Sequence, residues 1–238
     1  MAPQIKPMST RPQERVSLVP QPRRERLIAA IAEVVSEDGY QAASVSRIVA
    51  AAGVSRNSFY EHFSNKEECF LAAYDTAVER VVARMRGATR GSDGALGTFE
   101  DGLAAFLAFA VEEPALAWLC VVEVLAAGPR ALERRDDTMR RFAAYLERLR
   151  ADCGGEDRPS PLTEIVVGGA YEVIYARILN RETDQLPALL PDILYVWLAP
   201  IAGPVRATAA RAAAARRLGI DGGSLLRAAP EHGPIART

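Results

Sequence analysis

The sequence predicts an all-α protein with two helical domains, and three observations support this. Apolar residues recur along the chain at intervals of three and four, the spacing of one helix face. The period-two alternation of a half-buried strand is not found convincingly in any segment. Glycine and proline divide the 238 residues into segments of helical length. With 49% hydrophobic residues, the chain has enough apolar side chains for a sizeable core.

Residues 1–21 are predicted to form a flexible basic arm, because they contain four prolines and no helical periodicity. Residues 1–26 hold six basic and two acidic side chains, although the whole chain has a net charge of −1. A basic segment ahead of a nearly neutral body suits phosphate contact at one end of the molecule. The alternative is a solvated terminus that does not touch DNA.

The first helix is predicted from Pro22 to Gly39. Proline suits the first helical position, and glycine suits the position just after the last turn. The apolar stripe of this helix consists of Leu27, Ile28, Ile31, Val34 and Val35.

Residues 44–63 predict two short helices joined by a tight turn. Ser44 and Ser55 are residue types that cap helix N-termini, and Gly53 allows the positive φ of a sharp turn. Phe59 and Phe63 would face the core, which leaves a polar outer side on the second helix. This arrangement is typical of a helix-turn-helix DNA-binding unit.

The first turn of that second helix carries Arg56, Asn57 and Ser58. This is the part of a recognition helix that enters the major groove. Arginine can bind guanine O6 and N7, and asparagine can bind adenine N6 and N7. These residues therefore predict base recognition, and the alternative for each is an ordinary solvated position.

The same stretch resembles the signature of the TetR family of transcriptional regulators. The matching residues are Ser44, the alanines at 50–52, Gly53-Val54-Ser55, Phe59-Tyr60-Glu61-His62-Phe63 and Lys66-Glu67-Glu68. The resemblance is detailed over residues 22–82 and is one of layout beyond them. It implies a DNA-binding domain at 22–86, a helical effector-binding and dimerisation domain at 87–204, and phosphate contacts from Tyr60, His62 and Lys66.

Hydroxyl groups and free N–H groups at helix N-termini also suit phosphate oxygens. The predicted DNA-binding residues are therefore Ser44, Arg47, Ser55, Arg56, Asn57, Ser58, Tyr60, His62 and Lys66. The expected partner is double-stranded DNA with a roughly palindromic operator.

A capping box at residues 64–67 predicts the start of a long helix that ends at Gly87. This helix would leave the DNA-binding domain and enter the next one. Residues 87–97 contain four glycines and predict a flexible loop at the domain boundary. The loop lacks the Gly-Lys-Ser/Thr of a phosphate-binding loop, so a nucleotide site is rejected.

Three further helices are predicted over residues 99–113, 116–127 and 130–153. Aromatic residues are concentrated there, and their simplest interpretation is core packing. The family resemblance favours a cavity for a small apolar or amphipathic effector, with Glu123 either a counter-ion for a cationic ligand or a solvent-facing residue. The candidate pocket residues are Phe99, Phe106, Phe109, Trp118, Glu123, Met139, Phe142 and Tyr145.

Residues 161–180 and 186–201 are apolar almost all round, and a helix of this kind needs burial on every side. The family resemblance implies that these two helices pair with a second copy as a four-helix homodimer interface, and the alternative is burial within one subunit. The candidate interface residues are Val166, Gly169, Ile174, Ile178, Leu190, Leu194 and Trp197. The Ala/Arg-rich residues 205–238 are predicted to form a frayed helix and a disordered tail.

Other function classes have little support in the sequence. Three scattered cysteines and two histidines predict reduced thiols and no metal site, and neither a catalytic triad nor a cofactor loop is present. Since we find neither a signal peptide nor a long enough apolar span, we expect a cytoplasmic protein without a membrane partner. The favoured function is a ligand-released repressor rather than an enzyme, and the alternative is an architectural DNA-binding protein without an effector.

Overall fold

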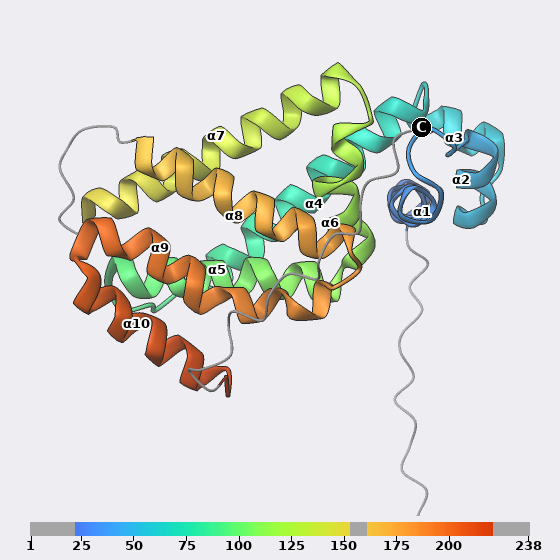
Figure 1. Ribbon diagram of the computed structural model, residues 1–238. Coiled ribbons are helices and arrows are strands. Elements are labelled where there is room, and N and C mark those ends of the chain that lie inside the picture. Colours follow the sequence, from blue (N-terminus) through green and yellow to red (C-terminus); the bar gives the residue numbers. More distant parts are fainter. Residues whose placement is uncertain (1–21, 153–160, 221–238) are drawn as a thin grey trace, which may run out of the picture.

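The computed structural model describes residues 22–152 and 161–220, and every regular element within these ranges is a helix (Figure 1). The all-α prediction is therefore confirmed for this part of the chain. The predicted basic arm, the last part of the predicted tail and Cys153 lie outside the described residues.

The N-terminal domain consists of three helices and the first half of a fourth. They are α1 (Arg23–Asp38), α2 (Val45–Ala52), α3 (Arg56–His62) and α4 (Lys66–Ala88). One hydrophobic core joins them, and its fully buried members include Leu27, Ile31, Ile48, Phe59 and Phe70. The stripe positions predicted for the first helices therefore face this core.

The capping box of α4 lies one residue later than predicted. Asn65, not Ser64, is the N-cap, and its side chain accepts the Glu68 backbone N–H at 2.9 Å. The Glu68 carboxylate in turn accepts the Ser64 backbone N–H at 2.9 Å. Two N–H groups at the helix start are thus satisfied, as in a capping box.

The C-terminal domain is a bundle of helices that the long α4 enters from the DNA-binding domain (Figure 1). Its elements are α5 (Gly94–Glu112), α6 (Pro114–Val121), η1 (Glu123–Leu125), α7 (Pro129–Asp152), α8 (Pro161–Leu179), η2 (Thr183–Leu189), α9 (Leu190–Ala202) and α10 (Pro204–Arg217). The predicted loop at 87–97 is shorter than expected, because only residues 89–93 separate α4 from α5. The predicted helix at 116–127 is broken after Val121, where the chain turns toward α1.

The helix predicted after Pro204 is present as α10, but it is packed on the bundle and not frayed. This helix packs on α9 through Ala207, Ala214 and Ala215, all buried. An ion pair joins Arg211 to Asp192 of α9 at 2.6 Å, and another joins Arg217 to Glu100 of α5. Alanine alone can give a helix a closely packed flat face, so the absence of large apolar residues did not signal exposure.

By length and composition alone, two helical stretches are apolar enough to cross a membrane, Gly94–Glu112 and Thr183–Ala202. The bent pair formed by Pro114–Leu125 and Pro129–Asp152 also passes this test. In the present fold the first two pack against other helices of the bundle, with Leu107 and Leu194 fully buried.

Candidate nucleic-acid interface and internal cavity

Serine caps begin both α2 and α3, and one glycine makes the turn between these helices. The Ser44 hydroxyl accepts the Arg47 backbone N–H at 3.3 Å, and the Ser55 hydroxyl accepts the Ser58 backbone N–H at 3.1 Å. Gly53 has φ 58° and ψ 40°, the left-handed conformation that strains other residues. The turn is therefore built as the sequence predicts, and both serines remain accessible beside the exposed side of α3.

Arg26 of α1 braces this turn, a role that the sequence did not reveal. Its guanidinium donates to the carbonyl oxygens of Ala52 and Gly53, the second at 2.9 Å. The carbonyl groups at the end of α2 lack helical partners, so a cation there is favourable. Arg26 thereby fixes the position of α2 and α3 relative to α1.

The outward face of α3 carries the polar groups that could read DNA. Arg56, Asn57, Tyr60 and His62 are all exposed, while Phe59 is fully buried beneath them. The Arg56 guanidinium lies 5.9 Å from the centre of the Tyr60 ring, within reach of a cation–π interaction. These side chains thus present donors from one side of a short, firmly anchored helix.

Ser58 is the one predicted base contact that the fold removes from the surface. Its side chain is 4% exposed, and its hydroxyl has no hydrogen-bond partner among the described residues. The prediction of a DNA contact from Ser58 is therefore wrong, because this position of α3 faces the core.

Lys66 and Arg47 are engaged with protein groups. The Lys66 ammonium donates to the carbonyl oxygens of Tyr40 and Ala43 at 2.7 and 2.8 Å, and burial lowers its pKa. The ammonium thus holds the loop between α1 and α2, and the phosphate contact of Lys66 stays a prediction. Arg47 forms ion pairs with Glu37 and Asp38, but it remains half exposed, so its DNA contact stays a prediction.

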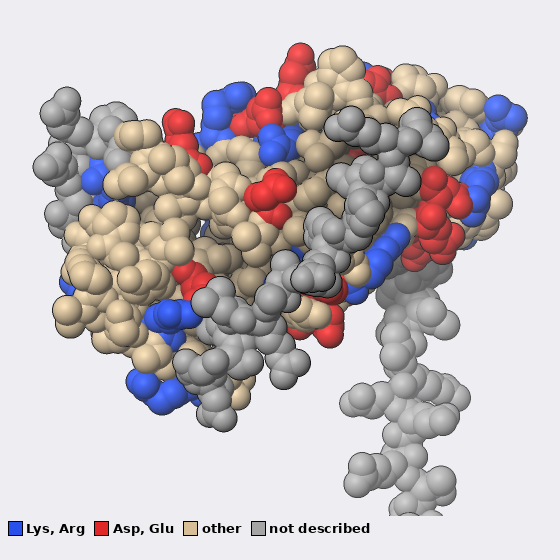
Figure 2. All heavy atoms as spheres, viewed as in Figure 1, with Lys and Arg blue, Asp and Glu red and all other residues tan. Residues whose placement is uncertain are grey.

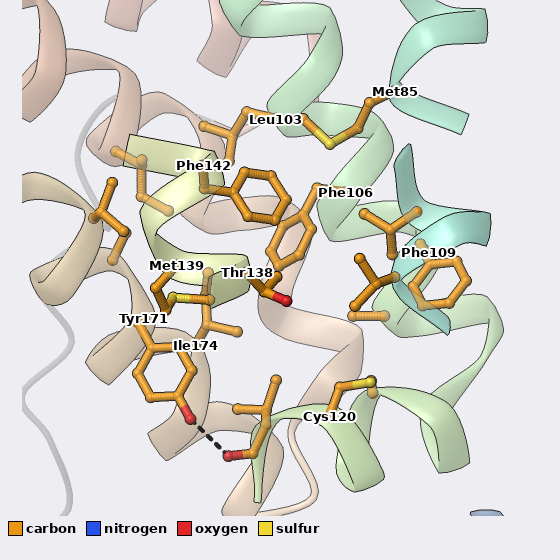
Figure 3. Close-up of a pocket in the computed structure, with 18 of the residues that line it drawn as sticks. Met85, Leu103, Phe106, Phe109, Cys120, Thr138, Met139, Phe142, Tyr171 and Ile174 are labelled. Carbon is orange, nitrogen blue, oxygen red and sulfur yellow. Dashed lines mark hydrogen bonds between the residues drawn. The ribbon is translucent and has the colours of Figure 1, made fainter. Parts of the chain in front are cut away.

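A cavity of about 160 Å³ lies among α4, α5, α6, α7 and α8 (Figure 3). None of the described residues that line it is charged. Six of the predicted pocket residues line it: Phe99, Phe106, Phe109, Met139, Phe142 and Tyr145. The Phe106 and Phe142 rings meet edge to face, with centroids 6.1 Å apart. Their contact with a ligand remains a prediction.

Tyr171, which the sequence did not single out, supplies a hydroxyl at the wall of this cavity. It donates to the Val121 carbonyl oxygen at 2.8 Å, the dashed line in Figure 3. Arg135 stacks on the Tyr171 ring at 4.4 Å from its centre, and its Nε donates to the phenol oxygen at 3.3 Å. Burial raises the pKa of Tyr171, so the phenol stays protonated. With Tyr74 and Thr138 nearby on the lining, this wall holds most of the hydroxyl groups of the cavity.

Trp118 and Glu123 do not line the cavity, so both are corrected as pocket residues. Glu123 is 8% exposed, which also excludes the solvent-facing alternative. Its two carboxylate oxygens accept the Tyr40 backbone N–H at 2.6 Å and the Trp118 indole N–H at 3.1 Å. These two donors compensate the free-energy cost of burying the charge. Hydrogen bonds of this kind are not evident from the sequence alone.

The predicted interface residues are also mostly corrected. Six of the seven are buried inside the subunit: Val166, Ile174, Ile178, Leu190, Leu194 and Trp197. Only Gly169 lies on the open face, and an added Cβ there would meet nothing within 4 Å. The same face of α8 exposes Leu162, Ile165 and Val173, and Ile165 is 66% exposed.

The described cysteines, Cys69 and Cys120, are free thiols. Burial raises the pKa of Cys69 to about 12, so this thiol is a poor nucleophile at neutral pH. In residues 22–152 and 161–220, no group of three or more His, Cys, Asp or Glu side chains is arranged to hold a metal ion.

Comparison with known proteins places these features among bacterial regulators. Residues 27–73 match the family model described as bacterial regulatory proteins, tetR family. The HTH-type transcriptional activator FasR of Mycolicibacterium smegmatis is 41% identical over 68 residues, 29% of this chain and 31% of that protein. The chain thus spans about a third of FasR. The HTH-type transcriptional regulator UidR of Escherichia coli K12 is 28% identical over 173 residues, 70% of this chain and 85% of that protein.

Two solved structures share most of this fold. The fatty acid degradation regulator FadR of Bacillus halodurans has a TM-score of 0.68 at 19% identity, covering 76% of this chain and 97% of that one. The transcriptional regulator FadR of Bacillus subtilis, in complex with stearoyl-CoA, has a TM-score of 0.63 at 18% identity, covering 75% and 98%. The fold therefore combines a helix-turn-helix domain with a helical C-terminal domain.

Proposed function

We propose that this chain, which belongs to the TetR family of helix-turn-helix transcriptional regulators, is a cytoplasmic dimeric repressor released from its operator by a small apolar or amphipathic effector. The observation that carries the DNA-binding part is the face of α3, where exposed Arg56, Asn57 and Tyr60 lie above a buried Phe59. Arg56 and Asn57 would read base edges, while Tyr60 and the serine caps would bind phosphate.

The DNA-binding proposal is tested by selecting sequences from a random pool with the purified protein and measuring affinity for the best site. We expect Arg56→Ala to weaken binding by about 1–3 kcal/mol, which is roughly fivefold to 150-fold, and to relax selectivity at one base. Tyr60→Ala should weaken binding at every sequence. Arg90→Ala, in the turn between α4 and α5, is the control and should bind as wild type. If both α3 variants match wild type, the recognition face is misassigned.

The proposed dimer would cover the apolar stripe on α8 formed by Leu162, Ile165, Gly169 and Val173. These residues recur at three and four positions, so they lie on one side of the helix. The open glycines 168 and 169 would allow close approach of a second backbone. The uncharged area where α9 meets α10 in Figure 2 is consistent with a covered surface at that end of the molecule. Two recognition helices on one two-fold axis would read half-sites about 34–36 Å apart.

The cavity supports an effector and disfavours the architectural alternative, which needs only a filled core. Its aromatic and aliphatic lining suits a hydrocarbon chain, since a charge there would be unpaired. Arg135, beside Tyr171 at the hydroxyl-bearing wall, would pair with an anionic head group. The stearoyl-CoA of the Bacillus subtilis neighbour is an amphiphile of this kind.

We would test the effector class with palmitate and hexadecanol, which share a chain and differ in head charge. Both should raise the melting temperature of the protein, because a ligand that binds only the folded state stabilises it. Arg135→Gln should weaken palmitate binding by about tenfold and leave hexadecanol binding unchanged. The control is Arg134→Gln, because its guanidinium pairs with Asp75, whereas that of Arg135 pairs with Asp136 and stacks on Tyr171. A cavity that binds neither probe would favour the architectural alternative.

A further inference from the structure

We propose that the buried carboxylate of Glu123 transmits the state of the cavity to the DNA-binding domain. Glu123, the Tyr40 amide and the Trp118 indole together form a polar connection that we name the Glu123 bridge. This proposal deepens the proposed function. It rests on that function only in the test that measures DNA binding. Glu123 is a positioning residue here, because it touches neither DNA nor the cavity.

On the side of the DNA-binding domain, the bridge holds the chain just after α1. Glu123 accepts the Tyr40 N–H at 2.6 Å, and the Tyr40 carbonyl accepts the Lys66 ammonium at 2.7 Å. The same ammonium reaches the Ala43 carbonyl at 2.8 Å, one residue before the cap of α2. A shift of the Glu123 carboxylate would therefore displace the loop that sets the position of α2.

On the side of the cavity, the bridge begins at α6. Cys120 and Val121 in the last turn of this helix line the cavity, and Trp118 in the same helix donates to Glu123 at 3.1 Å. The Val121 carbonyl accepts the Tyr171 hydroxyl at 2.8 Å, and Glu123 follows Val121 by two residues. A ligand that displaces Tyr171, or takes up its hydroxyl, would thus act directly on the segment that carries Glu123.

A second connection runs beside the bridge and joins the same elements. The Arg181 guanidinium stacks on the Trp118 ring at 3.6 Å from its centre and donates to the Ser36 carbonyl oxygen in α1. Arg181 has a φ of 61°, an unfavourable conformation for a residue with a side chain. The Gln41 amide adds a bond to the Ala126 carbonyl at 2.9 Å. Several polar contacts between the two domains thus lie around Glu123, in addition to the ion pairs that Arg130 and Arg134 of α7 make with α4.

Burial makes this connection suited to transmitting a shift. A buried carboxylate without partners is costly, so Glu123 is tied to its two donors. Neighbouring apolar groups, Leu119 and Val124, are fully buried and leave the backbone little freedom. Moving the end of α6 must therefore either carry the Tyr40 amide along or break a charged hydrogen bond.

The first test measures hydrogen exchange of the Tyr40 amide, which needs neither DNA nor effector. Glu123→Gln keeps the volume but offers one acceptor oxygen, so exchange should accelerate by at least about tenfold. Tyr171→Phe, remote from Tyr40, should accelerate it by at least about threefold. Tyr175→Phe is the control, because it also removes a phenol hydroxyl from a ring beside Tyr171, with ring centroids 6.4 Å apart. This variant should leave the exchange of the Tyr40 amide unchanged. Trp118→Phe provides a second break in the bridge if Glu123→Gln folds poorly.

The second test is a double-variant comparison of operator affinity. Glu123→Gln and Tyr171→Phe should each weaken operator binding by about fivefold or more. The operator affinity of the double variant should be no lower than that of the single variant that binds less tightly. Independent, multiplied effects would overturn the proposal, as would unchanged Tyr40 exchange in Tyr171→Phe. If wild type selects no DNA, the proposed function fails while the exchange test still decides on the bridge.

Discussion

Neighbouring residues of α3 have opposite surroundings, because successive side chains on a helix point about 100° apart. Asn57 is exposed, Ser58 and Phe59 are buried, and Tyr60 is exposed again. A list of polar residues in a recognition helix therefore overstates its DNA-binding surface. At the scale of single residues, burial separates the groups that hold the turn from those that can reach DNA.

The two serines at the start of α3 make this separation measurable. Ser55→Ala removes the N-cap, so the free energy of unfolding should fall by about 1 kcal/mol. Ser58→Ala removes a buried hydroxyl that has no partner among the described residues, so the free energy should stay the same or rise by up to about 1 kcal/mol. Urea denaturation of both variants measures the difference. A larger loss for Ser58→Ala than for Ser55→Ala would contradict this assignment.

The Glu68 cap should make stability depend on pH. The hydrogen bond from the Ser64 backbone N–H lowers the pKa of Glu68 below its ordinary value of 4.5. A lowered carboxyl pKa stabilises the fold above the unfolded pKa, and this contribution is lost as the pH falls through the folded pKa. Wild type should therefore exceed Glu68→Gln in unfolding free energy at pH 6, and the difference should shrink below pH 4.5. Denaturation at several pH values measures it, and a constant difference would argue against the charged cap.

At the scale of elements, the α2–α3 turn depends on the conformation of one glycine. An added Cβ at Gly53 would lie 2.8 Å from the Arg26 guanidinium, and φ there is +58°. Gly53→Ala should lower the free energy of unfolding by about 1–2 kcal/mol and weaken DNA binding. Gly87→Ala in α4, with open space around it, should instead raise the free energy by up to about 1 kcal/mol. Thermal denaturation compares the two, and equal effects would exclude a special role for the turn.

Local signals in the sequence were sufficient for α1, α2 and α3, because caps and apolar spacing act within one turn. They predicted the caps at Ser44 and Ser55 and the turn at Gly53. They did not predict which side of α8 faces its own core, because a helix that is apolar all round contains no orientation signal. The predicted interface residues therefore lie mostly on the inner side, and they do not include the exposed Ile165.

Partners distant in the sequence explain the remaining differences. Glu123 and Tyr40 are 83 positions apart, and Tyr171 and Val121 are 50 apart. Neither pair has a sequence spacing from which a contact could be predicted. The aromatic residues of the cavity can be predicted, since they are concentrated in three consecutive helices. In contrast, the sequence pattern does not distinguish Tyr171 from the other residues of an apolar helix.

At the scale of the whole molecule, α4 belongs to both domains. Phe70 near its start is buried in the DNA-binding core, while Val81 and Met85 near its end line the cavity. A tilt of α4 would thus move the recognition helix, and in a dimer the distance between two such helices would change. The control of operator binding is therefore a property of the proposed pair rather than of one subunit.

The open face of α8 gives the last prediction, which concerns this pair. Ile165→Arg places a charge at a 66% exposed position, so a lone subunit should keep its stability, whereas a packed interface would have to bury the charge. Light scattering should show a dimer for wild type and a monomer for the variant. Leu132→Arg, at a 37% exposed position of α7, is the control and should remain dimeric.

Because two linked half-sites bind far more tightly than one, the affinity of Ile165→Arg for a palindromic operator should fall by about a hundredfold, with half-site binding retained. A dimeric Ile165→Arg variant would show that the second copy binds at another surface.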